Sequence, residues 1–135
     1  MKIFVRNTLT GLIPLYPTDQ DEKRKLKLGE DYEANIRLPR NLGFHKKFFA
    51  LFNIAYQNTK LDMSEKAYRH YLTIKAGFFT AYTTPKGVFY EPDSISFDSM
   101  EQDEFENFYQ RFLDKVIEEL GTTSEEIEKQ LINFM

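Results

Sequence analysis

Residues 40–52 read RNLGFHKKFFALF, and they begin the most apolar segment of the chain. From here onward, large or small apolar side chains recur at the spacing of one helix face, namely Phe44, Phe48, Leu51, Phe52 and Ala55. Asn41 precedes them and is a suitable N-cap. The sequence therefore predicts a long, buried central helix from Asn41 to about Asn58.

The segments on either side of this helix alternate between short strand patterns and amphipathic helix patterns. We expect a hairpin from residues 2–16, a half-buried strand at 30–38, and a second hairpin at 79–91 that turns across Pro85, Lys86 and Gly87. Helical patterns cover residues 19–29, 62–77, 100–120 and 123–134. These elements predict an α+β fold in which a small, mainly antiparallel sheet packs against the Phe-rich central helix and a C-terminal helix.

Length and composition bound the class of protein. A chain of 135 residues is expected to form one domain, residues 1–135, with a core that 13 Phe and 8 Tyr can fill. There is no cysteine, which excludes disulfides and thiolate ligands and suits a reducing compartment. The apolar runs near residue 1 are too short for a signal peptide or a membrane span, so we expect a cytoplasmic protein without a membrane partner.

The charge of −3 conceals an uneven distribution. Residues 1–90 contain 15 Lys and Arg against 8 Asp and Glu, whereas residues 91–135 contain 3 against 13. Such a division favours a polyanionic or a basic partner. Two oppositely charged faces that dock on each other, or on a sister subunit, would explain it equally well.

Patterns typical of enzymes are scarce. The chain has two histidines and lacks the zinc-protease, phosphate-loop and nucleophile-elbow motifs. A metal-dependent nuclease would need converging carboxylates. The available acids are Asp93, Asp98, Glu101, Asp103, Glu104 and Glu106, of which several fall in a first helical turn, where acids favour the helix dipole. We therefore expect a non-enzymatic protein that needs no cofactor, and keep a nuclease as an alternative.

Basic side chains gather where the predicted strand 30–38 meets the central helix. They are Arg37, Arg40, His45, Lys46 and Lys47. Cations at a helix N-terminus do not stabilise the helix, but its free N–H groups and nearby cations suit a phosphate. Exposed tyrosines could stack bases, and Tyr56, Tyr68 and Tyr82 are candidates.

Two longer stretches resemble a family of uncharacterised phage and prophage proteins. These are LKLGEDYEANIRLPRNLGFHKKFFALFNIAY and SISFDSMEQDEFENFYQRFLDKV, and the likeness covers about residues 26–117. It implies a phage-derived protein that works in the cytoplasm of the host cell.

The layout is also distantly similar to the lambdoid NinB (Orf) recombination family. The matching positions here are Arg40, Asn41, Phe44, His45, Lys46 and Lys47, although Phe44 and His45 replace amides. The likeness implies a small α+β homodimer that binds single-stranded DNA and the host single-strand-binding protein, without catalysis. It adds Asn41 to the candidate nucleic-acid-binding residues, which are then Arg37, Arg40, Asn41, His45, Lys46 and Lys47.

Three hypotheses follow. The first is a single-stranded-DNA-binding accessory of phage recombination or replication. The second is a protein-interaction module, or an inhibitor of a host nucleic-acid machine, that acts through the acidic residues 91–128. The third is a metal-dependent nuclease.

Overall fold

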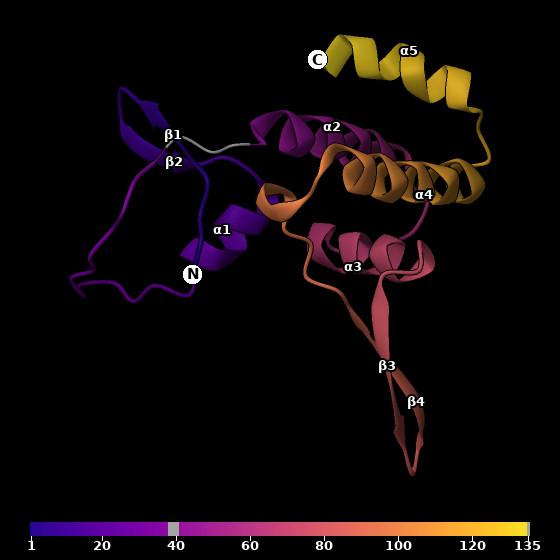
Figure 1. The fold of residues 1–135 in the computed structure, drawn as a ribbon, viewed down its shortest axis with the longest axis horizontal. Coiled ribbons are helices and arrows are strands. Elements are labelled where there is room, and N and C mark those ends of the chain that lie inside the picture. Colours follow the sequence, from indigo (N-terminus) through magenta and orange to yellow (C-terminus); the bar gives the residue numbers. More distant parts are fainter. Residues whose placement is uncertain (38–40, 135) are drawn as a thin grey trace. The chain divides into compact units, whose positions relative to one another are not determined.

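A computed structural model describes residues 1–37 and 41–134, the last without its side chain. The chain forms two compact units, Met1–Leu38 and Pro39–Met135, and each is described by itself. Figure 1 shows the elements in chain order. The expectation of a single domain over residues 1–135 stays a prediction.

The first unit contains a hairpin and a short helix. Strand β1 (Val5–Thr8) pairs antiparallel with β2 (Gly11–Pro14), and helix α1 (Pro17–Lys23) follows. The buried Asp19 carboxylate joins these parts, because it accepts hydrogen bonds from the Phe4 N–H at 2.9 Å and the Tyr16 N–H at 3.0 Å. Burial raises the pKa of Asp19 above its ordinary value.

The prediction of a strand at 30–38 is wrong over the part of that segment that the structure describes. Residues 30–37 form no strand, and Leu38 lies outside the described residues. The Tyr32 hydroxyl instead accepts a hydrogen bond from the Lys27 N–H at 3.0 Å, and Ile36 is exposed. Alternating apolar residues become a strand only where a neighbouring strand supplies hydrogen bonds and a core covers one face. Neither is present for this segment among the residues described.

Both hairpins in the described part of the chain are closed by turns with the same hydrogen bond. Strand β3 (Phe79–Thr84) pairs with β4 (Gly87–Pro92), as β1 pairs with β2. In each turn a threonine hydroxyl, of Thr8 or Thr84, donates to the carbonyl of the glycine three residues later, at 2.8 Å. Gly11 and Gly87 have φ values of 125° and 129°, a region that side chains disfavour. The hairpin expected at 79–91 is confirmed.

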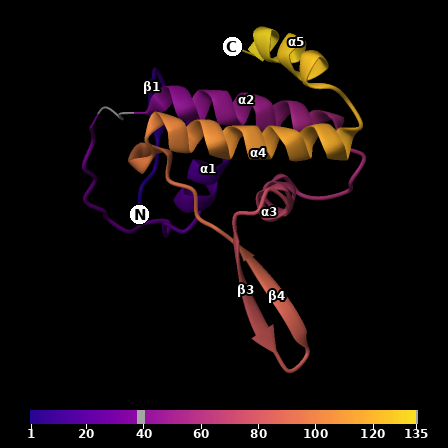
Figure 2. The same ribbon diagram turned by 45° about the vertical axis from the view of Figure 1, so that its right-hand side comes forward.

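The second unit is built on two long helices that lie side by side. Helix α2 (Leu42–Asn58) packs against α4 (Gln102–Leu120), with α3 (Glu65–Lys75) and α5 (Ser124–Phe134) on either side, as both ribbon views show (Figures 1 and 2). The central helix predicted from Asn41 to about Asn58 is confirmed. The hairpin β3–β4 extends away from these helices as a two-stranded arm (Figure 2).

Phenylalanine rings fill the space between α2 and α4. Phe48 is 4% exposed, and its ring centroid lies 4.9 Å from that of Phe112 and 5.5 Å from that of Phe108. The short 3₁₀ helix η1 (Phe97–Ser99) adds Phe97, whose ring is 5.2 Å from Phe48. Aromatic pairs at these distances contribute about 0.5–1.5 kcal/mol each beyond area burial. This cluster is the core of the second unit.

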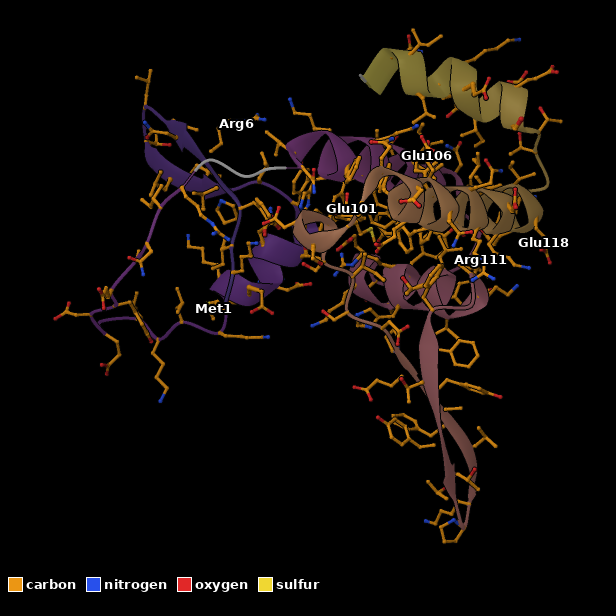
Figure 3. All side chains as sticks on the ribbon, in the orientation of Figure 1. Met1, Arg6, Glu101, Glu106, Arg111 and Glu118 are labelled. Atoms are coloured by element: carbon orange, nitrogen blue, oxygen red, sulfur yellow. The ribbon has the colours of Figure 1, made fainter. Side chains whose placement is uncertain are left out.

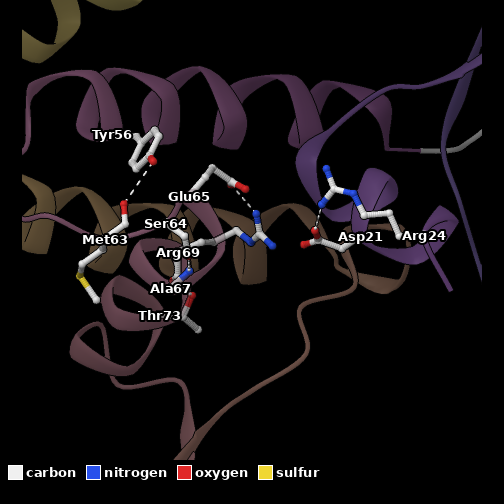
Figure 4. Close-up of polar contacts among 9 residues, drawn as sticks. All are labelled: Asp21, Arg24, Tyr56, Met63, Ser64, Glu65, Ala67, Arg69 and Thr73. Atoms are coloured by element: carbon white, nitrogen blue, oxygen red, sulfur yellow. Dashed lines mark hydrogen bonds and ion pairs between the residues drawn. The ribbon is translucent and has the colours of Figure 1, made fainter.

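Helix ends in the second unit follow local capping chemistry. Ser64 caps α3, because its side chain accepts a hydrogen bond from the Ala67 N–H at 3.1 Å (Figure 4). The buried Arg69 is ion-paired with Glu65 one turn earlier (Figure 4). Gly121, with φ of 67°, ends α4 in the left-handed conformation that glycine adopts readily.

A polar contact joins α2, α3 and α4 at one end of the core. The Glu119 carboxylate accepts hydrogen bonds from the Tyr68 hydroxyl and, at 2.9 Å, from the Thr59 hydroxyl. Burial raises the pKa of Tyr68 well above its ordinary value, and the bond to Glu119 raises it further. The contact fixes the end of α2 against its neighbours.

The predicted α+β class is confirmed, with two differences in arrangement. The strands form two separate two-stranded sheets instead of one sheet. The residues of β3 and β4 are nearly all exposed, so the helices supply most of the core. Within the described part of the chain, no helix is long and apolar enough to cross a membrane.

Candidate nucleic-acid interface

Asn41 stands at the N-cap position of α2, but its side chain does not cap the helix. Its Nδ2 group donates to the backbone carbonyls of Phe97 at 3.0 Å, Asp98 at 3.2 Å and Met100 at 3.3 Å. The side chain is therefore occupied in fastening η1 to the start of α2. The side-chain N–H groups of Asn41 are thus already used within the fold, and its role as a nucleic-acid contact stays a prediction.

His45 is buried, not part of an open first turn. It is 7% exposed, and its ring meets that of Phe97 edge-on at 4.8 Å between centroids. A ring in this position cannot reach a phosphate on the surface without leaving the core. His45 thus adds its ring to the aromatic cluster, and its role as a nucleic-acid contact stays a prediction.

Lys46 and Lys47 are both exposed, and they differ in their surroundings. The Lys47 ammonium lies 4.5 Å from the ring centroid of Tyr109 on α4, which is a cation–π contact. Lys46 stands about 100° away around the helix. The first turn of α2 contains no acidic residue, so these cations meet no opposing charge on that turn.

The described structure does not bring the other two predicted cations together with these lysines. Arg37 is exposed and belongs to the first unit, so the structure does not place it beside Lys46 and Lys47 of the second. Arg40 lies outside the described residues. Of the six candidates, Lys46 and Lys47 are thus the exposed cations that the structure places on one element.

An acid-free face along α2 extends the site beyond its first turn. Asn53 and Gln57 lie seven and eleven residues after Lys46, so all three fall within about 20° of one line along the helix. Asn53 and Gln57 are exposed, and so is Lys60 just past the helix end. We call Lys46, Asn53 and Gln57, together with Lys60 beyond the end of the helix, the α2 face. The sequence already indicated this acid-free face, because no Asp or Glu occurs between residues 42 and 60.

The three tyrosines considered as base stackers differ in how far they are buried. Tyr68 is fully buried, and Tyr56 is half-buried with its hydroxyl donating to the Met63 carbonyl at 3.2 Å (Figure 4). Tyr82 alone of the three is exposed, on the β3–β4 hairpin. The tyrosines predicted on α2 and α3 serve the core because their apolar rings complete it.

Acidic side chains cover α4 and α5. Glu106 and Glu118 project from α4, and Glu101 stands at its N-cap position (Figure 3). Further exposed acids on the two helices are Asp103, Glu104, Asp114, Glu125, Glu126 and Glu128. Among the residues that the structure describes, no three His, Asp or Glu side chains are grouped so that they could hold a metal ion.

These observations define a small α+β protein with an aromatic helical core, a basic, amide-bearing helix face and an acidic one. The chain belongs to the family described as "Protein of unknown function (DUF1367)", whose model matches residues 2–60 and 57–134. The expectation of an uncharacterised family is therefore confirmed. Neither a curated protein nor a solved structure matches the chain.

Proposed function

We propose that this protein is a non-enzymatic accessory of phage recombination or replication that binds single-stranded DNA along the α2 face. The family resemblance is the basis for the phage setting, for the host cytoplasm as the location, and for the host single-strand-binding protein as a second partner. The choice of binding surface rests on the α2 face itself, which offers cations and amides and no carboxylate.

The chemistry of that face suits a nucleic-acid backbone. Lys46 and Lys60 can each neutralise a phosphate and release its counterions, which is the main source of affinity in sequence-independent binding. Between them, the amides of Asn53 and Gln57 can donate to phosphate or sugar oxygens. Lys47 contributes charge while its ammonium stays over Tyr109.

Acidic residues elsewhere would orient the strand. The exposed carboxylates of α4 and α5 repel phosphate, so a strand on the α2 face is excluded from the acidic side of the same unit. The observation that carries the proposal is this contrast between one helix without acids and two helices rich in them.

The test compares two double variants of equal charge. Lys46→Gln/Lys60→Gln alters the α2 face, whereas Lys115→Gln/Lys129→Gln alters lysines of α4 and α5 that pair with Glu118 at 3.1 Å and Glu126 at 3.6 Å. Binding of a labelled single-stranded oligonucleotide is measured between about 50 and 200 mM salt. The first pair should weaken binding and flatten the log–log salt slope by about 1.4, or about 0.7 per lost contact.

The control pair decides whether position or net charge matters. It should leave the slope nearly unchanged, because each of its lysines already faces a carboxylate. Equal effects of the two pairs would mean that the chain attracts DNA only through its total charge. An unchanged slope in Lys46→Gln/Lys60→Gln would refute the α2 face as the binding surface.

The acidic surface supports a second candidate function, an interaction module for a basic protein. Here the exposed carboxylates of α4 and α5 would grip the partner, and the same oligonucleotide assay would show no binding. Replacing Glu101, Glu104 and Glu106 with Gln should then abolish capture of a basic partner, whereas the Lys46→Gln/Lys60→Gln variant should retain it.

A further inference from the structure

Helix α5 is held to the rest of its unit by few side chains. Of the α5 side chains that the structure describes, Ile127 and Leu131 are the buried apolar ones, and Ile132 is 77% exposed. Among the described residues, one hydrogen bond joins α5 to another helix, from Asn58 Nδ2 to Gln130 Oε1, and it is long at 3.4 Å. A helix of 11 residues is only marginally stable in water by itself. Elements with few buried contacts open first, so α5 can open locally while the core between α2 and α4 stays folded.

The surface beneath α5 contains a polar group without a partner. Tyr109, on the neighbouring helix α4, is 7% exposed, and its buried hydroxyl has no hydrogen-bond partner among the described residues. Burial raises the pKa of Tyr109 to about 12, and the Glu128 carboxylate adds to this rise, which places α5 near the hydroxyl. A buried hydroxyl that forms no hydrogen bond costs free energy, and it gains water as a partner when α5 moves away. The docked position of α5 is therefore destabilised by the residue that it covers.

Opening of α5 would expose an aromatic ring and a cation together. The Lys47 ammonium lies 4.5 Å from the centroid of the Tyr109 ring, and Lys47 follows Lys46 of the α2 face in the chain. Binding of single strands without sequence preference uses this combination, because bases stack on aromatic rings while cations meet the phosphates. In the docked position the ring is covered, and α5 itself carries three glutamates against one lysine.

We propose that α5 is an autoinhibitory helix, which when docked keeps single-stranded nucleic acid from the Tyr109 ring and which the strand displaces on binding. The inference rests on the proposed function, since it adds a base-stacking position beside the α2 face and a control over access to it. Docked α5 and a bound strand exclude each other because both occupy the same ring. A ligand that needs the open form shifts the population toward that form, and its apparent dissociation constant is the intrinsic one divided by the open fraction.

Hydrogen exchange of the full chain, read by mass spectrometry, tests the opening without nucleic acid. Amides of residues 124–133 should exchange at least about tenfold faster than those of residues 108–116 in the core, because local opening releases them separately. Ile127→Ala removes a buried anchor of α5 and should speed their exchange by about another tenfold or more. Ile132→Ala makes the same change at an exposed side chain and should leave exchange nearly unchanged. Tyr109→Phe removes the unpartnered hydroxyl and should slow it.

Binding of a labelled single-stranded oligonucleotide tests the inhibition. Ile127→Ala should tighten binding by about tenfold if roughly one chain in ten is open in the wild type. Tyr109→Phe keeps the ring but favours the docked position, so it should weaken binding by about twofold to fivefold. Ile132→Ala should bind as the wild type does. Saturating oligonucleotide should in turn speed the exchange of residues 124–133, because the bound strand holds α5 open.

Photocrosslinking locates the contact on the ring itself. An oligonucleotide that carries iodouracil should crosslink to Tyr109, and the yield should be higher in Ile127→Ala than in the wild type. The crosslinked peptide is identified by mass spectrometry after digestion. Crosslinks that omit Tyr109 in both chains would overturn it as a stacking position.

Each remaining outcome decides a separate point. Exchange of residues 124–133 as slow as that of residues 108–116 overturns the opening of α5. Equal binding by the wild type, Ile127→Ala and Tyr109→Phe, while Lys46→Gln/Lys60→Gln still weakens it, overturns the autoinhibition and leaves the proposed function standing. If neither the wild type nor Ile127→Ala binds, both are overturned.

Circular dichroism checks that the helices of each variant are intact. Should Ile127→Ala lose the core along with α5, Tyr109→Phe decides alone, because it removes a single buried oxygen and its expected effect has the opposite sign. Binding by Tyr109→Phe that equals or exceeds that of the wild type would then overturn the inference.

Discussion

Replacing Phe48 with Ala should lower the free energy of unfolding by about 4 kcal/mol. The side chain is 4% exposed and packs against rings from α2, η1 and α4. Losing the burial of a Phe ring costs about 2–3 kcal/mol. A residual cavity of roughly 60–80 Å³, at about 24 cal/mol per Å³, adds about 1.5–2 kcal/mol. Five other rings of the described structure surround Phe48, so the cavity cannot collapse fully; they belong to Phe49, Phe52, Phe97, Phe108 and Phe112.

Urea unfolding followed by far-ultraviolet circular dichroism measures this loss, provided that the slope with denaturant is unchanged. Phe89→Ala is the matched control, because the same atoms are removed from a side chain that is 58% exposed. It should change stability by no more than about 0.5 kcal/mol. A loss below about 2 kcal/mol for Phe48→Ala would refute the assignment of this residue to the centre of the core.

Two further predictions concern polar groups near this core. Asn41→Ala should cost about 1–3 kcal/mol in urea unfolding, because the carbonyls of residues 97, 98 and 100 lose their donor; a neutral result would mean that water replaces the amide. Tyr109→Phe should be neutral or stabilising by up to about 1 kcal/mol at neutral pH, since the Tyr109 hydroxyl is buried without a hydrogen-bond partner among the described residues. Burial raises the pKa of Tyr109 to about 12. The stability linked to the neutral Tyr109 hydroxyl is therefore fully present below pH 10, the ordinary pKa of tyrosine, and is lost as the pH rises toward 12. The variant should therefore lose stability less steeply over that interval, and an equal alkaline decline would contradict the assignment.

Local patterns predicted the elements whose stability depends on neighbours in the sequence. The apolar spacing from Phe44 onward gave the extent of α2, and the turn residues Pro85, Lys86 and Gly87 gave the second hairpin. Gly121 ends α4, and the Thr123 hydroxyl accepts a hydrogen bond from the Glu126 N–H at 3.3 Å at the start of α5. Capping and turn chemistry involve residues within a few positions of one another, so a single sequence contains all the partners.

The candidate site was predictable only in part. The sequence indicated where cations gather, and Lys46 and Lys47 are exposed as a contact with DNA requires. It could not indicate that Asn41 donates to carbonyls more than fifty residues away, or that His45 packs on Phe97. Both side chains look available in a helical first turn until η1 folds back over it.

By itself, then, the sequence determined the α+β class, the central helix and the charge of each segment. Tertiary structure decided which polar residues became structural, that residues 30–37 remained unpaired, and that the β3–β4 aromatics faced solvent. The physical reason is that burial and strand pairing are properties of a neighbour in space. An alternating or aromatic pattern reports the capacity of a segment for such contacts, and only the folded chain supplies or withholds the partner.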